Sequence, residues 1–419
     1  MRMQYRGVPF DKELFEKLQK ELRQRIAACV SELEKHAPEH PEGNAWSWGN
    51  NQPINEDDPA VGSGRNGIKR ALALKGIELP NLKKSTRVEF LASNRKKEPL
   101  FEALHRYLIY RKLHNDSKDW IKLHYEGGRL YPGVKFYSQV TGRSAFEKPA
   151  LQNIPKKDGG IDLEFSLRDC IRTPDSHRII KADYAAQELR ILARITGDEA
   201  LTQALTEPGS DPHLKVAEHI AGKPLRRGTP EGEKYRKLGK RANFGFAYGS
   251  GPKTYQAAVY EDSAERITLK QAKEEREAFR KTWPKVTRWQ TSFGSRKGNE
   301  PDAWFAESGF GRRRYVGPDS EGKPKYTDRL NAPVQSNGAD MLYYAVNLLS
   351  EDRAQGVLPG VDVLFTTHDE ICLEAPHEVA GEALDWLLRR MRDATRELIG
   401  EELASDDCVE GDIGQSWAE

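Results

Sequence analysis

Two aspartates, Asp183 and Asp369, stand where their carboxylates could support a chemical reaction. Each follows a run of strand-forming residues, 178–181 and 361–366, so we expect each at the end of a strand or in the turn after it. Carboxylates on adjacent strands repel one another unless cations neutralise them, and Mg²⁺ binds one or two carboxylates together with substrate phosphates. The pair therefore predicts a two-metal site for phosphoryl transfer. For either aspartate alone, a turn residue or a helix N-cap is the commoner role.

A second set of residues recurs every four positions in YRKLGKRANFGFAYGSG, namely Arg236, Lys240, Phe244 and Tyr248. Four helical residues turn by about 400°, so these side chains share one face. The cations could bind a triphosphate, and the rings could stack on a base. The alternative is an ordinary helix with its aromatics in the core and its cations in water. The shared face favours the first interpretation, as does Gly245, which lowers helix stability with no evident packing role.

The elements that must position these residues follow from the hydrophobic periodicity. Helical spacing at 11–35, 68–75 and 99–123 predicts a mostly helical first part, interrupted by a long loop rich in Pro, Gly and Asn. Strand-like runs follow in GGRLYPGVKFYSQVTG, HRIIKADY and VDVLFTTHDEICLEA, and a helix-rich stretch covers about 198–289.

The composition indicates a globular protein of 419 residues with two or three subdomains, since 37% of the residues are hydrophobic. We find neither an apolar run long enough to cross a bilayer nor a secretory signal, so a cytoplasmic location is expected. The four scattered cysteines suggest neither zinc nor disulfides. Basic clusters at 223–241 and 311–315 are typical of a phosphate-binding surface, although a solvated helix face is the commoner explanation for any one cluster.

Three of these segments, DYAAQELR, RKLGKRANFGFAYG and THDE, resemble in order and spacing motifs A, B and C of the family A (polymerase I type) DNA polymerases. Further segments are similar to other parts of that family, namely TGRSAFEKPALQNIP, DPH, GRRRYV, NAPVQSNGAD and the ending DIGQSWAE. The resemblance is clear from about residue 128 to 419 and looser before it. Even without the ending, seven ordered motifs are a specific signal, whereas any one of the short ones would be weak.

The resemblance implies an α+β right-hand polymerase fold, with an antiparallel palm sheet and helical fingers and thumb. It divides the chain into a thumb (1–128), a first part of the palm with motif A (129–196), fingers with the motif B helix (197–298) and a second part of the palm with motif C (299–419).

It also implies a metal site. Asp183 and Asp369 would hold two Mg²⁺ ions, with Mn²⁺ as an alternative, and the backbone carbonyl of Tyr184 would be a further ligand. Lys240 would be the acid that protonates the departing pyrophosphate.

The incoming nucleotide would contact His213, Arg236, Lys240, Phe244, Glu188 and Tyr248. The histidine and the two cations would grip the triphosphate, and the phenyl ring would stack beside the sugar and base. Glu188 would close off the space that a ribose 2′-hydroxyl needs, and Tyr248 would guard the template position.

The DNA would contact Arg143, Gln152, Asn153, Asn331, Gln335, His368 and Glu370. Arg143 and Gln335 would test the minor groove beside the primer end, where every correct pair presents similarly placed acceptors. For His368, a structural role is the alternative. Arg190 is expected to pair within the palm.

The implied activity is template-directed addition of deoxynucleotides to a primer 3′-hydroxyl, in DNA replication or repair in a bacterial or phage-infected cell. Because the similarity begins at the thumb, no proofreading exonuclease and no 5′ nuclease is expected. The expected partners are primer-template DNA and deoxynucleoside triphosphates, and we expect a monomer. The alternatives are a relative of the single-subunit RNA polymerases and a catalytically inactive DNA-binding relative.

Two positions depart from the family pattern. Gln187 stands where an aliphatic residue is common, which predicts a polar side chain beside Glu188 and looser sugar discrimination. Thr327 stands where an arginine is usual, and Arg329, two residues on, either compensates for it or leaves that contact missing, which bears on fidelity.

Overall fold

The computed structural model describes residues 6–41, 43, 45–46, 48, 65–79, 81–83, 86–87, 90, 98–139, 141–154, 163–263, 265–295 and 301–419. The predicted loop that follows the first helix lies largely outside the described residues. None of the helices in the described ranges is both long and apolar enough to cross a membrane.

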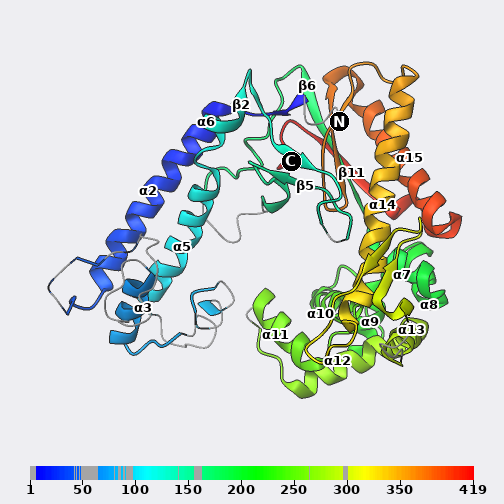
Figure 1. The fold of residues 1–419 in the computed structure, drawn as a ribbon, viewed down its shortest axis with the longest axis horizontal. Helices are drawn as coiled ribbons and strands as arrows, with labels where there is room; N and C mark the ends of the chain where they lie inside the picture. Colours follow the sequence, from blue (N-terminus) through cyan, green and yellow to red (C-terminus); the bar gives the residue numbers. More distant parts are fainter. Residues whose placement is uncertain are drawn as a thin grey trace.

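Four antiparallel strands form the central sheet, in the order β11-β6-β10-β9 (Figure 1). They are β6 (His177–Tyr184), β9 (Asp362–Thr367), β10 (Glu370–Pro376) and β11 (Val409–Gly414). Strands β9 and β10 form a hairpin in which Thr367 pairs with Glu370, so the turn between them contains only His368 and Asp369. The predicted strands β6, β9 and β10 are confirmed, whereas β11 was not predicted.

The two faces of the sheet carry different residues of each strand, because side chains alternate along a strand. Ile180, Ala182 and Tyr184 of β6 belong to a core shared with the helices α14 (Tyr326–Ala354) and α15 (Ala380–Ile399). Ile179 belongs to a separate core that includes the first part of the chain. Asp183 therefore lies on the face of β6 that is turned away from α15.

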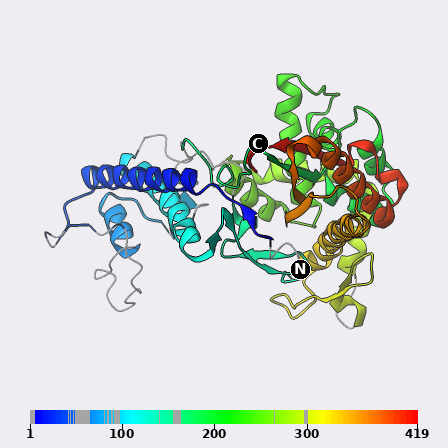
Figure 2. The same ribbon diagram turned by 90° about the horizontal axis from the view of Figure 1, so that it is seen from above.

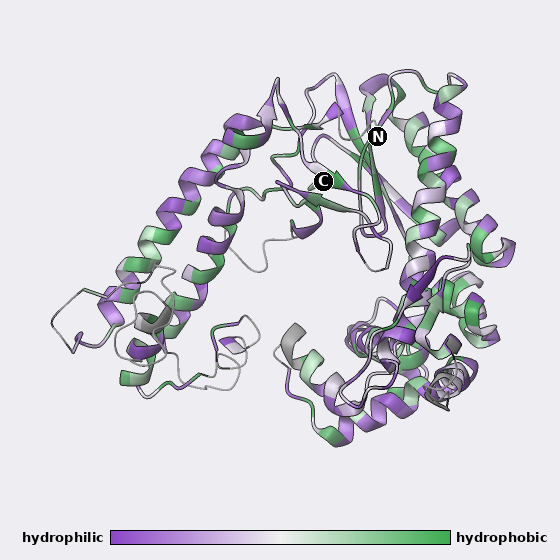
Figure 3. Cartoon of the chain, in the orientation of Figure 1, coloured by the Kyte–Doolittle hydropathy of each residue, from purple (hydrophilic) through white to green (hydrophobic). Residues whose placement is uncertain are grey.

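The first part of the chain forms a helical arm. The long helices α2 (Lys12–His36) and α5 (Pro99–Ser117) run side by side away from the central sheet (Figures 1 and 2). The side chain of Asp11 caps α2 by accepting a hydrogen bond of 2.9 Å from the backbone N–H of Leu14. Hydrophilic and hydrophobic residues alternate along α2, as expected for a helix with one buried face (Figure 3).

Smaller elements complete this arm, namely α3 (Arg65–Leu74), α6 (Trp120–His124) and a sheet of β1 (Val8–Pro9), β3 (Arg129–Leu130) and β2 (Tyr125–Glu126). The predicted helices are confirmed, except that the stretch predicted at 99–123 is two helices, α5 and α6, separated by Lys118 and Asp119.

A second helical arm lies on the other side of the sheet (Figure 1). It comprises α7 (Gln187–Thr196), α8 (Glu199–Thr206), α9 (Pro212–Ala221), α10 (Pro230–Phe246), α11 (Pro252–Ser263), α12 (Leu269–Thr282) and α13 (Pro284–Ser295). The helix-rich stretch predicted for about 198–289 is thereby confirmed.

Gly245 of α10 has a packing role, contrary to the sequence-based expectation. A Cβ atom at this position would overlap the ring of Tyr255 in α11. The Tyr255 ring is fully buried and packs at 4.2 Å, between ring centroids, from Phe246. The glycine therefore lets α10 and α11 approach closely, and it is no evidence for a ligand.

Two small hairpins are separate from the central sheet. One pairs β4 (Gly133–Lys135) with β5 (Ala145–Glu147), and the other pairs β7 (Phe305–Glu307) with β8 (Arg313–Tyr315).

Candidate active site

Asp183 and Asp369 meet where β6 lies beside the β9–β10 turn. Asp183 is the residue before the end of β6, and the backbone N–H of Tyr184 donates to the carbonyl oxygen of Asp369 at 3.4 Å. The two carboxyl groups are close enough to share a hydrogen bond. Burial and the nearby charge of Asp183 raise the pKa of Asp369 to about 7. The predicted meeting of the two aspartates is confirmed, and the pair is under electrostatic strain that a cation would relieve.

The donor set fits magnesium. Across the ranges that the structure describes, no three histidine, cysteine, aspartate or glutamate side chains form a group able to enclose a metal. Two carboxylates without a third suit Mg²⁺, which takes its remaining ligands from water and substrate phosphates. The hydroxyl of Tyr184 donates to the carbonyls of Met341 and Met391, so its side chain faces the core and only its backbone carbonyl could be a ligand.

One face of α10 carries the predicted stripe. The Lys240 ammonium lies 6.0 Å from the centre of the Phe244 ring, which is 43% exposed. The His213 ring, from α9, lies 5.8 Å from the same ring. The shared face of Arg236, Lys240 and Phe244 is confirmed, whereas Tyr248 lies beyond the end of α10.

Asp211 links α9 to this face. One carboxylate oxygen caps α9 by accepting from the backbone N–H groups of His213 (2.8 Å) and Leu214 (3.1 Å), and the other accepts from Arg236 at 2.5 Å. Burial alone would raise the pKa of Asp211, but the hydrogen bonds from Arg236 and the backbone hold it below its ordinary value. Sequence reasoning missed this contact, although Asp before Pro-His is a recognisable N-cap signal.

Glu188 joins three separate segments. Its carboxylate accepts a hydrogen bond from the hydroxyl of Tyr248 and lies 3.5 Å from the guanidinium of Arg143. Burial and the charge of Glu188 raise the pKa of Tyr248 well above its usual range. Arg143 in turn lowers the pKa of Asp369 through its charge, so the same guanidinium acts on both Glu188 and Asp369.

Gln187 does not lie against the sugar-facing side of Glu188. It is buried, its side-chain amide donates to the carbonyl of Gly338 in α14 at 3.3 Å, and a Cβ at Gly338 would press on it. The expectation of a polar group beside Glu188 is therefore wrong. Gln187 is the first residue of α7, and its hydrogen bond to Gly338 shows that its side chain points towards α14.

Arg190 pairs within the sheet region, as expected. It donates to the carbonyl of Leu403 (3.0 Å), to the hydroxyl of Ser405 (2.9 Å) and to the carboxylate of Asp407 (3.1 Å).

The predicted DNA-contacting residues divide into two groups. Asn331 and Gln335 lie one turn apart on α14 and remain partly exposed, although most of their neighbours are buried. Asn153 is also exposed.

Gln152 and Glu370 have internal partners instead. The Gln152 amide bonds to the backbone of Phe146 at 2.9 and 3.0 Å, and Glu370 is buried and accepts from the indole N–H of Trp417 at 2.7 Å. His368 donates to the Gln152 carbonyl at 3.2 Å.

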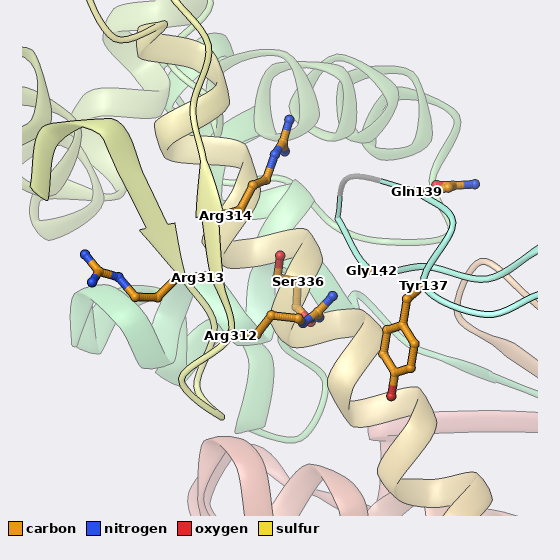
Figure 4. Close-up of a pocket in the computed structure, with 7 residues that line it drawn as sticks. All are labelled: Tyr137, Gln139, Gly142, Arg312, Arg313, Arg314 and Ser336. Carbon is orange, nitrogen blue, oxygen red and sulfur yellow. The ribbon is translucent and has the colours of Figure 1, made fainter.

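A basic pocket of about 230 Å³ adjoins the exposed group (Figure 4). It is lined by Tyr137, Gln139, Gly142, Arg312, Arg313, Arg314 and Ser336. Figure 4 shows the Arg312 side chain pointing towards Ser336, whereas the Arg313 side chain extends away from the other labelled residues. Arg312 donates to the carbonyls of Thr141 (3.2 Å) and Ser336 (3.0 Å) and to the carboxylate of Asp340 (2.5 Å), so it ties the loop before Arg143 to α14.

Arg329 does not replace the missing arginine at 327 on the surface. Arg329 is only 3% exposed and therefore lies in the interior of the protein.

Comparison with known proteins agrees with this geometry. The POL domain of Pol1 from M. smegmatis, solved in complex with DNA primer-template and dNTP, superposes with a TM-score of 0.78 at 21% identity, covering 100% of this chain and 68% of that one. The chain therefore has the α+β right-hand polymerase fold that the sequence predicted.

Comparisons of the sequence identify the family to which the chain belongs. The model of DNA polymerase family A matches residues 66–419, and the chain belongs to that family. The thermostable DNA polymerase I of Thermus aquaticus is 31% identical over 349 residues, which cover 80% of this chain and 38% of that protein. DNA polymerase I of Aquifex aeolicus (strain VF5) is 27% identical over 304 residues, which cover 72% of this chain and 48% of that protein. The chain thus spans less than half the length of these relatives.

Proposed function

We propose that the chain is a template-directed DNA polymerase that adds deoxynucleotides to a primer 3′-hydroxyl. Its thumb would be residues 1–128, its palm 129–196 and 299–419, and its fingers 197–298. The observation that carries the proposal is the approach of Asp183 and Asp369, connected through Arg143 and Glu188 to Tyr248, two residues beyond the end of α10.

Asp183, Asp369 and the carbonyl of Tyr184 are the residues that would hold Mg²⁺. The bound metal would lower the pKa of the primer hydroxyl and stabilise charge on the reacting phosphate. The strand β6 and the two-residue turn hold these groups on rigid backbone, so the primer end and the nucleotide meet a fixed geometry.

The exposed face of α10 would bind the nucleotide. Arg236 and Lys240 supply two positive charges to a triphosphate, and Phe244 offers its exposed ring to the sugar and base. When the 3′-oxygen bonds to the α-phosphorus and pyrophosphate leaves, the Lys240 ammonium would donate a proton to the departing oxygen.

Glu188 would select deoxyribose. Its carboxylate is fixed from two sides by Tyr248 and Arg143, so it cannot easily move away from a 2′-hydroxyl. This fixed position supports the role that the resemblance implies for Glu188, which is to exclude a ribose 2′-hydroxyl.

The duplex would lie along the partly exposed residues Asn331 and Gln335 and the basic pocket. Such binding depends mainly on phosphate contacts, so it is expected to be independent of sequence and to weaken steeply as salt increases.

Primer extension tests the proposal. With a primed DNA template and dNTPs, we expect extension that requires Mg²⁺ and stops with EDTA. Extension with NTPs in preference to dNTPs would indicate an RNA polymerase-like enzyme. Tight, salt-sensitive primer-template binding without extension would indicate an inactive DNA-binding relative.

A further inference from the structure

His213 contacts the buried residue Asn243, which in turn contacts the buried residue Trp283. No part of the proposed mechanism uses either of these two residues. Asn243 of α10 is fully buried, and Trp283, which follows α12, is 1% exposed. The indole N–H of Trp283 donates to Oδ1 of Asn243 at 2.8 Å. Nδ2 of Asn243 lies 3.0 Å from the Pro212 carbonyl oxygen and 3.0 Å from Nδ1 of His213.

These contacts fix the orientation of the Asn243 amide. An indole N–H can only donate a hydrogen bond, and a carbonyl oxygen can only accept one. A flipped amide would place its NH₂ group against the Trp283 N–H and its oxygen against the Pro212 carbonyl. Oδ1 therefore faces Trp283, and the NH₂ group faces Pro212 and His213.

The amide orientation in turn fixes the protonation of His213. Nδ2 of Asn243 donates to Nδ1 of the imidazole, so Nδ1 is an acceptor and carries no proton. A neutral imidazole has one proton, which must then be on Nε2, at the opposite edge of the ring.

The charged groups around His213 are Asp211, Arg236 and Lys240. Burial lowers the pKa of His213 to about 4, and the two cations act in the same direction, whereas Asp211 opposes them. At neutral pH the imidazole is uncharged.

We propose that Trp283 acts through Asn243 to hold His213 as the neutral Nε2–H tautomer, so that His213 meets the incoming triphosphate as an uncharged, directed hydrogen-bond donor. This rests on the proposed function, in which His213 contacts the triphosphate. Trp283 and Asn243 are positioning residues, because they act through His213. Arg236 and Lys240 supply positive charge to the nucleotide. His213 supplies a hydrogen bond whose direction does not change between pH 6 and 8.

The tautomer is tested on the free protein by long-range ¹H–¹⁵N NMR of the imidazole nitrogens, with His213→Gln to assign the signals. We expect Nδ1 without a proton and Nε2 with one. Trp283→Phe keeps a ring but removes one of the two contacts that orient the Asn243 amide, so a fraction of flipped amide, and with it a mixture of tautomers, is expected. Asn243→Asp presents an acceptor, so Nδ1 should become protonated. Trp120→Phe removes an indole N–H that donates to the Asp116 carbonyl at 2.8 Å, and should change nothing.

Nucleotide binding is tested by the KM for dNTP between pH 6 and 8. Loss of one directed hydrogen bond in Trp283→Phe should raise KM by about 3- to 10-fold, with a smaller effect on kcat. In Asn243→Asp, KM should fall as the pH decreases, because an imidazolium attracts the triphosphate. Trp283→Phe serves as the test where Asn243→Asp does not fold.

Three results would overturn the proposal. These are a proton on Nδ1 in the unmodified protein, imidazole signals that are unchanged in Trp283→Phe, and an unchanged KM in a variant whose imidazole signals do change. A protein with the expected imidazole signals but no nucleotide incorporation would instead contradict the proposed function and leave the tautomer assignment supported.

Discussion

The backbone N–H of Tyr184 donates to the carbonyl oxygen of Asp369 at 3.4 Å, where β6 passes the β9–β10 turn. This contact holds two segments almost two hundred residues apart in one register, with Asp183 opposite Glu370 in the ladder. The carboxylates of Asp183 and Asp369 are therefore placed by backbone pairing, which is more rigid than side-chain packing alone.

Glu188→Ala should weaken the discrimination against ribonucleotides. The carboxylate excludes a 2′-hydroxyl by occupying its space, and relief of a steric clash of this kind changes selectivity on the order of 10- to 100-fold. The measurement is the ratio of kcat/KM for dNTP to that for NTP. Glu382→Ala, which removes a carboxylate from the exposed start of α15, is the control. An unchanged ratio in Glu188→Ala would show that another residue excludes the hydroxyl.

Gly245→Ala should destabilise the second helical arm, because the added methyl group would overlap the Tyr255 ring. Overpacking at a buried contact costs about 1–3 kcal/mol of the free energy of unfolding. Chemical denaturation measures this loss. At Gly251, an added Cβ meets no atom within 4 Å, so Gly251→Ala should leave stability nearly unchanged. Equal stability of the two variants would mean that α10 and α11 do not pack as described.

Stability should depend on His213 at mildly acidic pH. The pKa of His213 is about 4 in the folded state against an ordinary value of 6.5, because burial disfavours the charged form. Below pH 6.5 the unfolded chain takes up the proton and the folded chain does not, so this contribution to stability is complete above pH 6.5 and decreases as the pH falls towards 4. Between pH 7.5 and 5 the unmodified protein should lose on the order of 2 kcal/mol more than His213→Gln.

The comparison is made by urea denaturation at both pH values. His377→Gln, which replaces an exposed histidine, should show the same loss as the unmodified protein. If His213→Gln also loses as much as the unmodified protein, the imidazole takes up its proton in the folded state.

Arg312→Gln should impair the extension of correctly paired primers and lower the free energy of unfolding by about 2 kcal/mol. It removes the hydrogen bonds that tie Thr141 and Ser336 together. Thr141 lies two residues before Arg143, and Ser336 directly follows Gln335. Arg312→Lys should restore little of the extension or the stability, because one ammonium group cannot reproduce the several hydrogen bonds that the planar guanidinium donates in fixed directions.

Primer extension and thermal denaturation measure these two effects. Arg313→Gln is the matched control, since Arg313 is more exposed than Arg312 and its side chain extends away from Ser336 and Gly142 (Figure 4). If Arg313→Gln is as defective as Arg312→Gln, general loss of positive charge explains both.

The sequence predicted the elements that carry strong periodic or motif signals. Strands β6 and β9 were expected because strand-forming residues precede each aspartate, and β10 because a second such run follows Asp369. The face of α10 was expected because residues four apart share one side of a helix whatever that helix packs against. The edge strand β11 was missed because its acidic, glycine-containing sequence has little strand propensity, and pairing with β6 overrides it.

What the sequence could not predict depends on contacts between distant segments. Gly245 is explained by Tyr255 on the next helix, and Gln187 is turned towards α14 by the space at Gly338. Glu370 is directed into the interior by Trp417, almost fifty residues away. Local patterns give no information on such partners, since each depends on how two helices or strands come together.

The most direct test of the account is primer extension by Asp369→Ala on a primed DNA template with Mg²⁺ and dNTPs. Asp412→Ala, which removes an exposed carboxylate from β11 in the same sheet, is the control. We expect Asp369→Ala to bind primer-template but to extend it at least about 10³-fold more slowly, a loss of about 4 kcal/mol in transition-state stabilisation, while Asp412→Ala extends normally. Extension by Asp369→Ala at the unmodified rate would contradict the assignment of Asp183 and Asp369 as the catalytic pair.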